Sequence, residues 1–272
     1  MNILDRFKIK KLMKKAFNLS LEGDYLEALK IYNDILKDNK DIDTVWYGKA
    51  TVLSKLNRFK EASLSYDEAL KLNPNYYDVW YNKGLNLESW GKFEDALVAY
   101  NKALKLNSDD FLLLINMGVT LAKLNRYDDA LKKFDEVLNN DSKCFKALYN
   151  KGLVFFEMES YENALNYFDK ALNINPNNAK LLSSKALALS YLGKKEKSLI
   201  YFDKSLKIFP DDFIALYNKS VVLNELGNFD AYLKYLNKSL NCINGVLNIN
   251  PEMEEAIELK TMILEKINNS KK

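Results

Sequence analysis

The stretch YDVWYNKGLNLESWGKFEDALVAYNKALKLNSDD at residues 77–110 is closely similar to FKALYNKGLVFFEMESYENALNYFDKALNINPNN at residues 145–178. The two stretches begin 145 − 77 = 68 residues apart, which is twice 34, and Tyr-Asn-Lys recurs once more, from Tyr217. A fixed period of this length is the signature of a repeat architecture, so it is tested before any other assignment. We therefore interpret the whole chain as an array of 34-residue units.

Seven units follow one another without a gap when Ile9 is taken as position 1. They leave a basic N-terminal extension at 1–8 and a C-terminal segment at 247–272, which we interpret as the end of a lengthened last helix and a capping helix. The predicted units are 9–42, 43–76, 77–110, 111–144, 145–178, 179–212 and 213–246.

Each unit carries two apolar stripes at helical spacing. Positions 4, 8 and 11 hold a large, a small and a large residue, and positions 17, 20 and 24 hold an aromatic, an alanine and an aromatic in most units. Between the stripes, position 15 is glycine or asparagine, the residues that tolerate the left-handed end of a helix, except at Glu159. Each unit is therefore predicted to be two antiparallel helices joined by a tight turn.

This pattern of large, small, aromatic, alanine, aromatic and proline resembles the tetratricopeptide repeat family over residues 9–246. The resemblance implies an all-α fold, a right-handed superhelical α-solenoid of helical hairpins. Unit 7 departs from the pattern because Tyr232 stands at position 20; a one-residue slip would instead place Ala231 there. Asn250-Pro251 follows 7 residues later than the period requires, so we expect a last repeat helix lengthened by about two turns, then a helix from about Glu252 to Ile267. This last helix either caps the solenoid or occupies its groove.

The composition excludes several functional classes. Net charge is +3, with +5 in the first fifteen residues, so the chain as a whole has no electrostatic drive toward nucleic acid. No apolar run approaches the roughly 18 residues of a membrane span, and the start lacks a secretory signal, so a cytoplasmic protein is expected. Without histidine, and with Cys144 and Cys242 far apart, neither a metal site nor a cofactor is expected. Because the usual general base is missing and the carboxylates fit helix capping and solvation, we do not expect an enzyme.

The first helix of each unit carries a further apolar stripe, at positions 5 and 9, where a solvated face would be polar. In the family that the chain resembles, partners lie in the concave groove lined by these helices. The tyrosines of position 5 either contact a partner or pack against the next unit. The residues predicted to bind a partner are Tyr47, Tyr81, Leu85, Ile115, Tyr149, Phe156, Tyr191 and Tyr217.

These observations favour an adaptor that binds a partner helix or an extended peptide in a tyrosine-rich groove. The carboxylate clamp that the family uses for chaperone tails needs lysine at position 5 and asparagine at position 9 of one repeat, and no unit has both. The alternative is a peripheral membrane or anionic-surface adaptor, in which a short basic amphipathic helix is formed by the nearby basic residues with Ile3, Leu4, Phe7 and Leu12. Capping of the first unit explains the same segment without a membrane. The sequence names no partner and no oligomeric state.

Overall fold

The chain folds entirely into helices in the computed structural model, which describes residues 3–269. Within that range there are fifteen helices and no strand. They form two compact units, Met1–Lys133 and Phe134–Lys272, each described here by itself. The helices are α1 (Ile3–Glu22), α2 (Tyr25–Asp38), α3 (Asp43–Lys55), α4 (Phe59–Leu72), α5 (Tyr77–Ser89), α6 (Phe93–Leu106), α7 (Phe111–Lys123), α8 (Tyr127–Asn140), α9 (Phe145–Glu157), α10 (Tyr161–Ile174), α11 (Ala179–Tyr191), α12 (Lys195–Ile208), α13 (Phe213–Glu225), α14 (Phe229–Ile249) and α15 (Glu254–Asn269).

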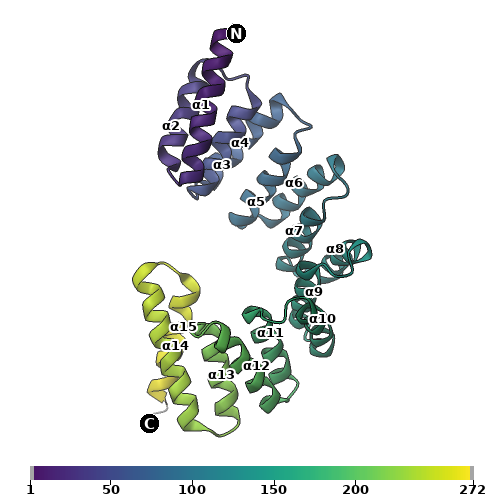
Figure 1. Cartoon of the computed structure of the whole chain (residues 1–272), viewed down its shortest axis with the longest axis vertical. Helices are drawn as coiled ribbons and strands as arrows, with labels where there is room; N and C mark the ends of the chain where they lie inside the picture. The colour runs from purple at the N-terminus through teal and green to yellow at the C-terminus, as the bar shows by residue number, and fades with distance from the viewer. Residues whose placement is uncertain (1–2, 270–272) are drawn as a thin grey trace. The chain divides into compact units, whose positions relative to one another are not determined.

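Within each of the two compact units, the helices pair as successive antiparallel hairpins, which Figure 1 shows for α1–α2, α3–α4 and α13–α14. The odd-numbered helices from α3 to α13 have 13 residues each, and they begin at residues 43, 77, 111, 145, 179 and 213, which is one every 34 residues. The fold is therefore an all-α helical repeat solenoid, as the periodicity predicts. Residues 3–8 of the N-terminal extension continue α1 as one helix; the side chains of Ile3 and Leu4 lie outside the described residues.

The turn inside each hairpin is closed by one residue in the left-handed conformation at position 15. Four of these residues are glycines with φ between 72° and 88°, at Gly23, Gly91, Gly193 and Gly227. Asn57, Asn125 and Glu159 occupy the same position with φ of 58°, 57° and 56°. Glu159 thus adopts a conformation that its Cβ disfavours, because the two helices it joins fix the path of the turn.

Replacing Glu159 with glycine is expected to raise the free energy of unfolding by about 1 kcal/mol, because the left-handed conformation is strained for a residue with a Cβ. Urea denaturation should show a higher midpoint with an unchanged slope. Glu159→Ala is the matched control, since alanine removes the charge and keeps the Cβ. An equal gain in the alanine variant would assign the effect to charge and would contradict the strain argument.

The core of the hairpins α3–α4, α5–α6, α9–α10 and α11–α12 is an aromatic ring of position 24 packed against the small residue of position 8. The rings of Tyr66, Tyr100, Phe168 and Phe202 are each at most 1% exposed. At Gly84 the ring approaches so closely that a Cβ would lie 2.3 Å from Tyr100 Cε1, and at Gly152 a Cβ would lie 2.6 Å from Phe168 Cδ1. The small residue is therefore required by helix–helix contact.

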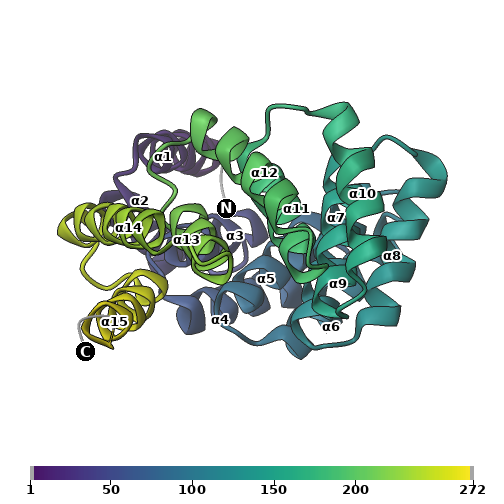
Figure 2. The ribbon, with the colours of Figure 1, turned by 90° about the horizontal axis from the view of Figure 1, so that it is seen from below.

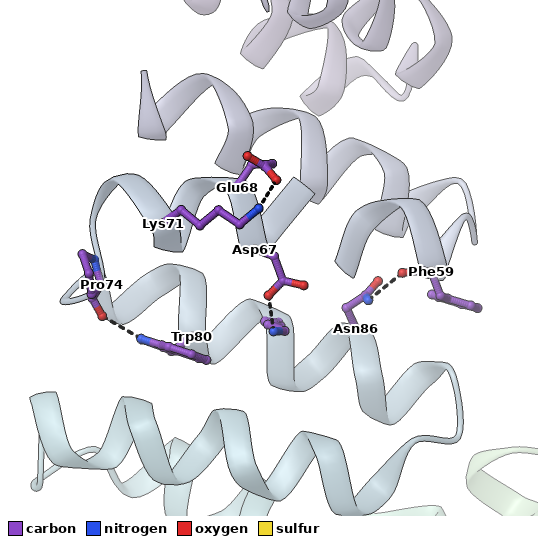
Figure 3. Close-up of polar contacts among 8 residues, drawn as sticks. Phe59, Asp67, Glu68, Lys71, Pro74, Trp80 and Asn86 are labelled. Atoms are coloured by element: carbon purple, nitrogen blue, oxygen red, sulfur yellow. Dashed lines mark hydrogen bonds and ion pairs between the residues drawn. The ribbon is translucent and has the colours of Figure 1, made fainter. Parts of the chain in front are cut away.

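At four junctions, successive hairpins are joined by a buried or half-buried lysine of position 7 that binds an aspartate of position 25 in the preceding repeat. Lys83 Nζ lies 2.5 Å from Asp67 Oδ1, and Figure 3 shows the Asp67 side chain reaching from α4 toward its partner. Lys219 Nζ lies 2.5 Å from Asp203 Oδ1. The remaining two pairs are Lys151 with Asp135 and Lys185 with Asp169. The four, called the Asp–Lys pairs below, are each 16 residues apart in sequence.

Further polar contacts hold the connections between hairpins in place (Figure 3). The indole of Trp80 donates a hydrogen bond to the carbonyl of Pro74 at 2.8 Å, which ties α5 to the loop that precedes it. The Asn86 amide donates to the carbonyl of Phe59 at 3.0 Å, which joins α5 to the start of α4. Such contacts between neighbouring repeats are what an isolated hairpin lacks.

The C-terminal part departs from the period. Helix α14 has 21 residues, seven more than each of the second helices α2, α4, α6, α8, α10 and α12, and α15 packs beside it (Figures 1 and 2). Tyr232 is 7% exposed and stays at the packing position of the repeat, while Ala231 is half-buried beside it. Ala256 and Ile263 of α15 are fully buried against Leu236 and Ile243 of α14. Helix α15 therefore covers α14 as one more layer.

Candidate protein-binding surfaces

The position 5 tyrosines lie half-buried along the first helices, with their hydroxyl groups engaged by the next repeat. Asn82 Nδ2 donates to the hydroxyl of Tyr47 at 3.0 Å, and Asn116 Nδ2 donates to that of Tyr81 at 2.9 Å. The hydroxyl groups therefore pack between repeats, which is one of the two alternatives drawn from the sequence. Contact of the half-buried rings with a partner stays a prediction.

In the second compact unit, the Tyr149 hydroxyl is likewise engaged by the next repeat, because it lies 3.3 Å from Ser184 Oγ. In the first unit, burial, with a smaller contribution from Asp78, raises the pKa of Tyr47 to about 12. Burial also raises the pKa of Tyr81. Tyr47 and Tyr81 therefore stay protonated at neutral pH and act as neutral, largely apolar surface with a polar edge.

A cluster of three aromatic rings stands on the second unit, formed by Phe156, Tyr161 and Tyr191. The ring of Tyr191 stacks on Tyr161 with 5.0 Å between centroids and meets Phe156 edge-on at 5.5 Å. Tyr191 remains 60% exposed. The sequence identifies Phe156 and Tyr191 as candidates but not Tyr161, because position 17 otherwise reads as internal packing.

Tyr217 is partly covered by the C-terminal helix. Its hydroxyl donates to Met262 Sδ of α15 at 3.0 Å, so α15 reaches the face on which this tyrosine lies. The C-terminal helix thus both covers α14 and approaches the candidate surface at this one residue. The Tyr217 hydroxyl is therefore engaged by α15, and the side chain as a whole is half-buried.

Ile115 and Leu85 differ in how far they reach the surface. Ile115 is 5% exposed, so in this structure its side chain is part of the interior packing. Leu85 is half-buried and lines a hollow of about 500 Å³ together with Asn82 and Tyr66. The candidate residues of the first unit that reach a surface are therefore Tyr47, Tyr81 and Leu85.

A second hollow, apolar and of about 510 Å³, lies between α1, α2 and α3, and Tyr47 is the one candidate residue in its lining. Met13, Phe17, Leu21 and Tyr47 supply much of its apolar lining, and Gly48 forms part of its wall. The signal in the sequence is Gly48, a glycine that belongs to neither the turns nor the position 8 contacts. We call this hollow the N-terminal pocket.

Two further properties bear on what the surfaces can do chemically. Within residues 3–269, no group of three or more His, Cys, Asp or Glu side chains is arranged to hold a metal ion. In the same range, no helix combines the length and the apolar character needed to cross a membrane.

Architecture and surface define a helical-repeat protein of the kind that presents binding surfaces on stacked hairpins. Family models described as tetratricopeptide repeat match residues 44–76, 77–110, 99–132, 145–178 and 179–212. The chain belongs to the tetratricopeptide repeat family, whose members are protein-interaction scaffolds.

Solved structures of the same fold cover most of the chain at low identity. A tetratricopeptide repeat protein from Parabacteroides merdae has 17% identity and a TM-score of 0.77, over 94% of this chain and 98% of that one. PilW, a type IV pilus biogenesis factor, has 18% identity and a TM-score of 0.67, over 82% and 100%. MamA from Desulfovibrio magneticus has 21% identity and a TM-score of 0.56, over 62% and 96%. None of the curated proteins matches the sequence.

Proposed function

We propose that this protein is a non-catalytic cytoplasmic adaptor that binds a partner helix or extended peptide on the tyrosine-rich faces of its first helices. The observation that carries the proposal is the exposed cluster of Phe156, Tyr161 and Tyr191. Three rings with centroids 5.0–5.5 Å apart, one of them 60% exposed, form an apolar patch that solvation alone does not explain. Aromatic side chains give large contact areas at low entropic cost, which is why they dominate recognition surfaces.

The charges on the same faces support a partner of mixed character in most of the array. Glu88 accepts hydrogen bonds from Tyr100 at 3.0 Å and from Lys123 at 2.9 Å. Glu225 pairs with Lys195 at 3.2 Å. Because these acidic and basic groups neutralise one another, the surfaces around them favour apolar and hydrogen-bonding contacts over a highly charged ligand.

The proposal is tested by selecting peptides from a random displayed library against the full chain and measuring their affinity by fluorescence anisotropy. We expect selected peptides to bind the unaltered chain and to bind Phe156→Ser/Tyr191→Ser at least about tenfold more weakly, as for loss of aromatic anchors. Serine is placed here and not at Tyr81 or Tyr149, whose hydroxyl groups also join neighbouring repeats.

Phe209→Ser is the matched control, because Phe209 is an aromatic residue of the same unit, 54% exposed, in the connection between α12 and α13. Circular dichroism should show full helicity in all variants. Equal loss of affinity in the control, or unchanged affinity in the double variant, would contradict the assignment of binding to this face. A library that yields no binding peptide would contradict the proposed function itself.

A further inference from the structure

The N-terminal pocket lies where the contacts between repeats change. At the next two junctions, a position 5 tyrosine accepts a hydrogen bond from a position 6 asparagine, as in Tyr47–Asn82 and Tyr81–Asn116. At the first junction these positions hold Met13 and Gly48, which have no side-chain group that can form this bond. The hydrogen bond between repeats that is present at the next two junctions is thus missing here, where an apolar hollow is found instead.

Glycine at position 48 is required by the wall of the pocket. A Cβ there would lie 2.5 Å from Cζ and 2.6 Å from the hydroxyl oxygen of Tyr32, so the Tyr32 ring occupies the space that a side chain would need. Tyr32 is itself 4% exposed and lines the pocket from α2. The wall of the hollow is therefore formed by close packing between helices α2 and α3.

The floor of the pocket is apolar and its rim is basic. Phe17 is 57% exposed and Leu21 is 72% exposed, which is unusual for two large apolar side chains one helical turn apart. Lys14 and Lys55 are the charged residues of the lining, which includes no carboxylate among the described residues. Neither lysine forms an ion pair within residues 3–269, in contrast to Lys123 on the same helical faces.

The carboxylates nearest to these lysines along the chain are outside the pocket lining. Glu22 ends α1, Asp24 caps α2 by accepting a hydrogen bond from the backbone of Glu27, and Glu61 pairs with Arg58 at 2.6 Å. The other fourteen of the first fifteen residues carry a net charge of +4 in addition to Lys14. Asp5, Asp34, Asp38 and Asp41 line a separate hollow with Lys8 and do not line the N-terminal pocket. The pocket therefore combines exposed apolar area with uncompensated positive charge, and a ligand of opposite charge is favoured.

We propose that the N-terminal pocket binds an acidic amphipathic helix, with two or three bulky apolar side chains on one face and carboxylates flanking them. The apolar side chains enter between α1 and α3, and the carboxylates pair with Lys14 and Lys55. A volume of about 510 Å³ lies within the range, about 300–1,000 Å³, of sites that hold such apolar groups. This proposal rests on the proposed function, because it names the chemical class of one partner of the adaptor.

The probes are fluorescein-labelled synthetic helices of about four turns with leucine at i, i+4 and i+7. They differ only in their flanking residues, which are glutamate, glutamine or lysine. With the full chain at about 0.05 M salt, we expect the glutamate peptide to bind about tenfold more tightly than the lysine peptide, with glutamine between them. The preference should shrink at about 0.5 M salt because exposed charges are screened.

Two variants separate the apolar and the charged contributions. Lys14→Glu/Lys55→Glu should reverse the order of the three peptides and leave the glutamine peptide nearly unchanged. Phe17→Ser/Leu21→Ser should weaken all three at least about tenfold, and exposed serine at both sites leaves the buried core untouched. Phe209→Ser, at an exposed aromatic residue outside both candidate surfaces, is the matched control and should change none of the three affinities.

The outcomes distinguish this inference from the proposed function. If library-selected peptides bind the chain but the three probes show no charge preference, or if Phe17→Ser/Leu21→Ser leaves their affinity unchanged, the acidic-helix proposal fails and the adaptor function stands. If neither probes nor selected peptides bind, both fail. If the chain instead forms a dimer that Phe17→Ser/Leu21→Ser dissociates, the pocket holds a second copy of this chain and the proposal is overturned.

Discussion

Replacing Gly152 with alanine is expected to lower the free energy of unfolding by about 1–2 kcal/mol, whereas the same substitution at Gly245 is expected to raise it by about 1 kcal/mol. At Gly152 the new Cβ would lie 2.6 Å from two ring carbons of Phe168 and 3.4 Å from Tyr167 Cβ. At Gly245, within the lengthened helix α14, no heavy atom lies within 4 Å of the new Cβ. The two sites thus separate contact from helix propensity.

Helix propensity favours alanine over glycine by about 1 kcal/mol at both positions, so the sign at Gly152 depends on whether overpacking costs more. Phe168 is fully buried and cannot move outward without opening the hairpin. Phe168→Leu in the Gly152→Ala background should recover part of the loss, which a double-mutant cycle measures by urea denaturation. A stabilising effect at Gly152, or additive effects of the two substitutions, would contradict the close-contact explanation.

Replacing Asp135 with asparagine is expected to cost about 1–2 kcal/mol, while replacing its partner Lys151 with methionine is expected to cost much less. Lys151 is 6% exposed, so removing the carboxylate leaves a buried ammonium group without its counter-charge. The Asp135 side chain is 51% exposed and can be solvated when the lysine is absent. The double variant Asp135→Asn/Lys151→Met should therefore be close to the unaltered chain in stability.

The chain itself contains this double replacement, since Asn101 and Met117 occupy the corresponding positions one repeat earlier. The expected pH dependence follows from the Lys151 pKa. Burial lowers that pKa, but the hydrogen bonds that the ammonium group donates to Asp135 and Tyr167 outweigh burial, so the pKa is raised. A raised folded-state pKa contributes stability below the unfolded value, about 10.4, and this contribution is lost as the pH rises through the folded-state pKa.

Without Asp135, burial should depress the Lys151 pKa, so the stability of the variant should increase as the pH approaches the unfolded value. The difference in free energy of unfolding between Asp135→Asn and the unaltered chain is therefore expected to be smaller at about pH 10 than at pH 7. Chemical denaturation at the two pH values measures it. A gap independent of pH, or a Lys151→Met variant as unstable as Asp135→Asn, would contradict this description of the pair.

Periodicity predicts the helices, the turns and the packing stripes because these depend on neighbours along one chain. Position 15 illustrates this, since even Glu159 takes the left-handed conformation that Asn57 and Gly91 adopt. The side-chain contacts between repeats are harder to predict, because their partners depend on how one hairpin is staggered on the next. The bond between Tyr47 and Asn82 joins residues 35 apart, and nothing in a single unit indicates it.

On the candidate surface, too, features within one repeat are predictable and contacts between helices of different repeats are not. The stripe at position 5 predicts tyrosines on the faces of the first helices, but not that Met262 of α15 would reach Tyr217. It also does not predict the N-terminal pocket, because the pocket forms where one repeat lacks the position 5 tyrosine and the next repeat lacks the position 6 asparagine. Met13 and Gly48 each look like a minor departure from the pattern, and the structure shows that both line the pocket, where Tyr32 packs against Gly48.

The Asp–Lys pairs also bear on how a chain of similar repeats avoids stacking in the wrong order. If repeats 77–110 and 145–178 exchanged places, Lys151 would follow Asp67 and Lys83 would follow Asp135, so both lysines would still have an aspartate. However, Lys185 would then follow Asn101, and Asp169 would precede Met117. The exchange would place the largely buried ammonium group of Lys185 beside an amide, a cost that sequence similarity alone would not impose. Because some junctions between repeats have an Asp–Lys pair and others do not, the junctions are not interchangeable, which disfavours the swapping of repeats.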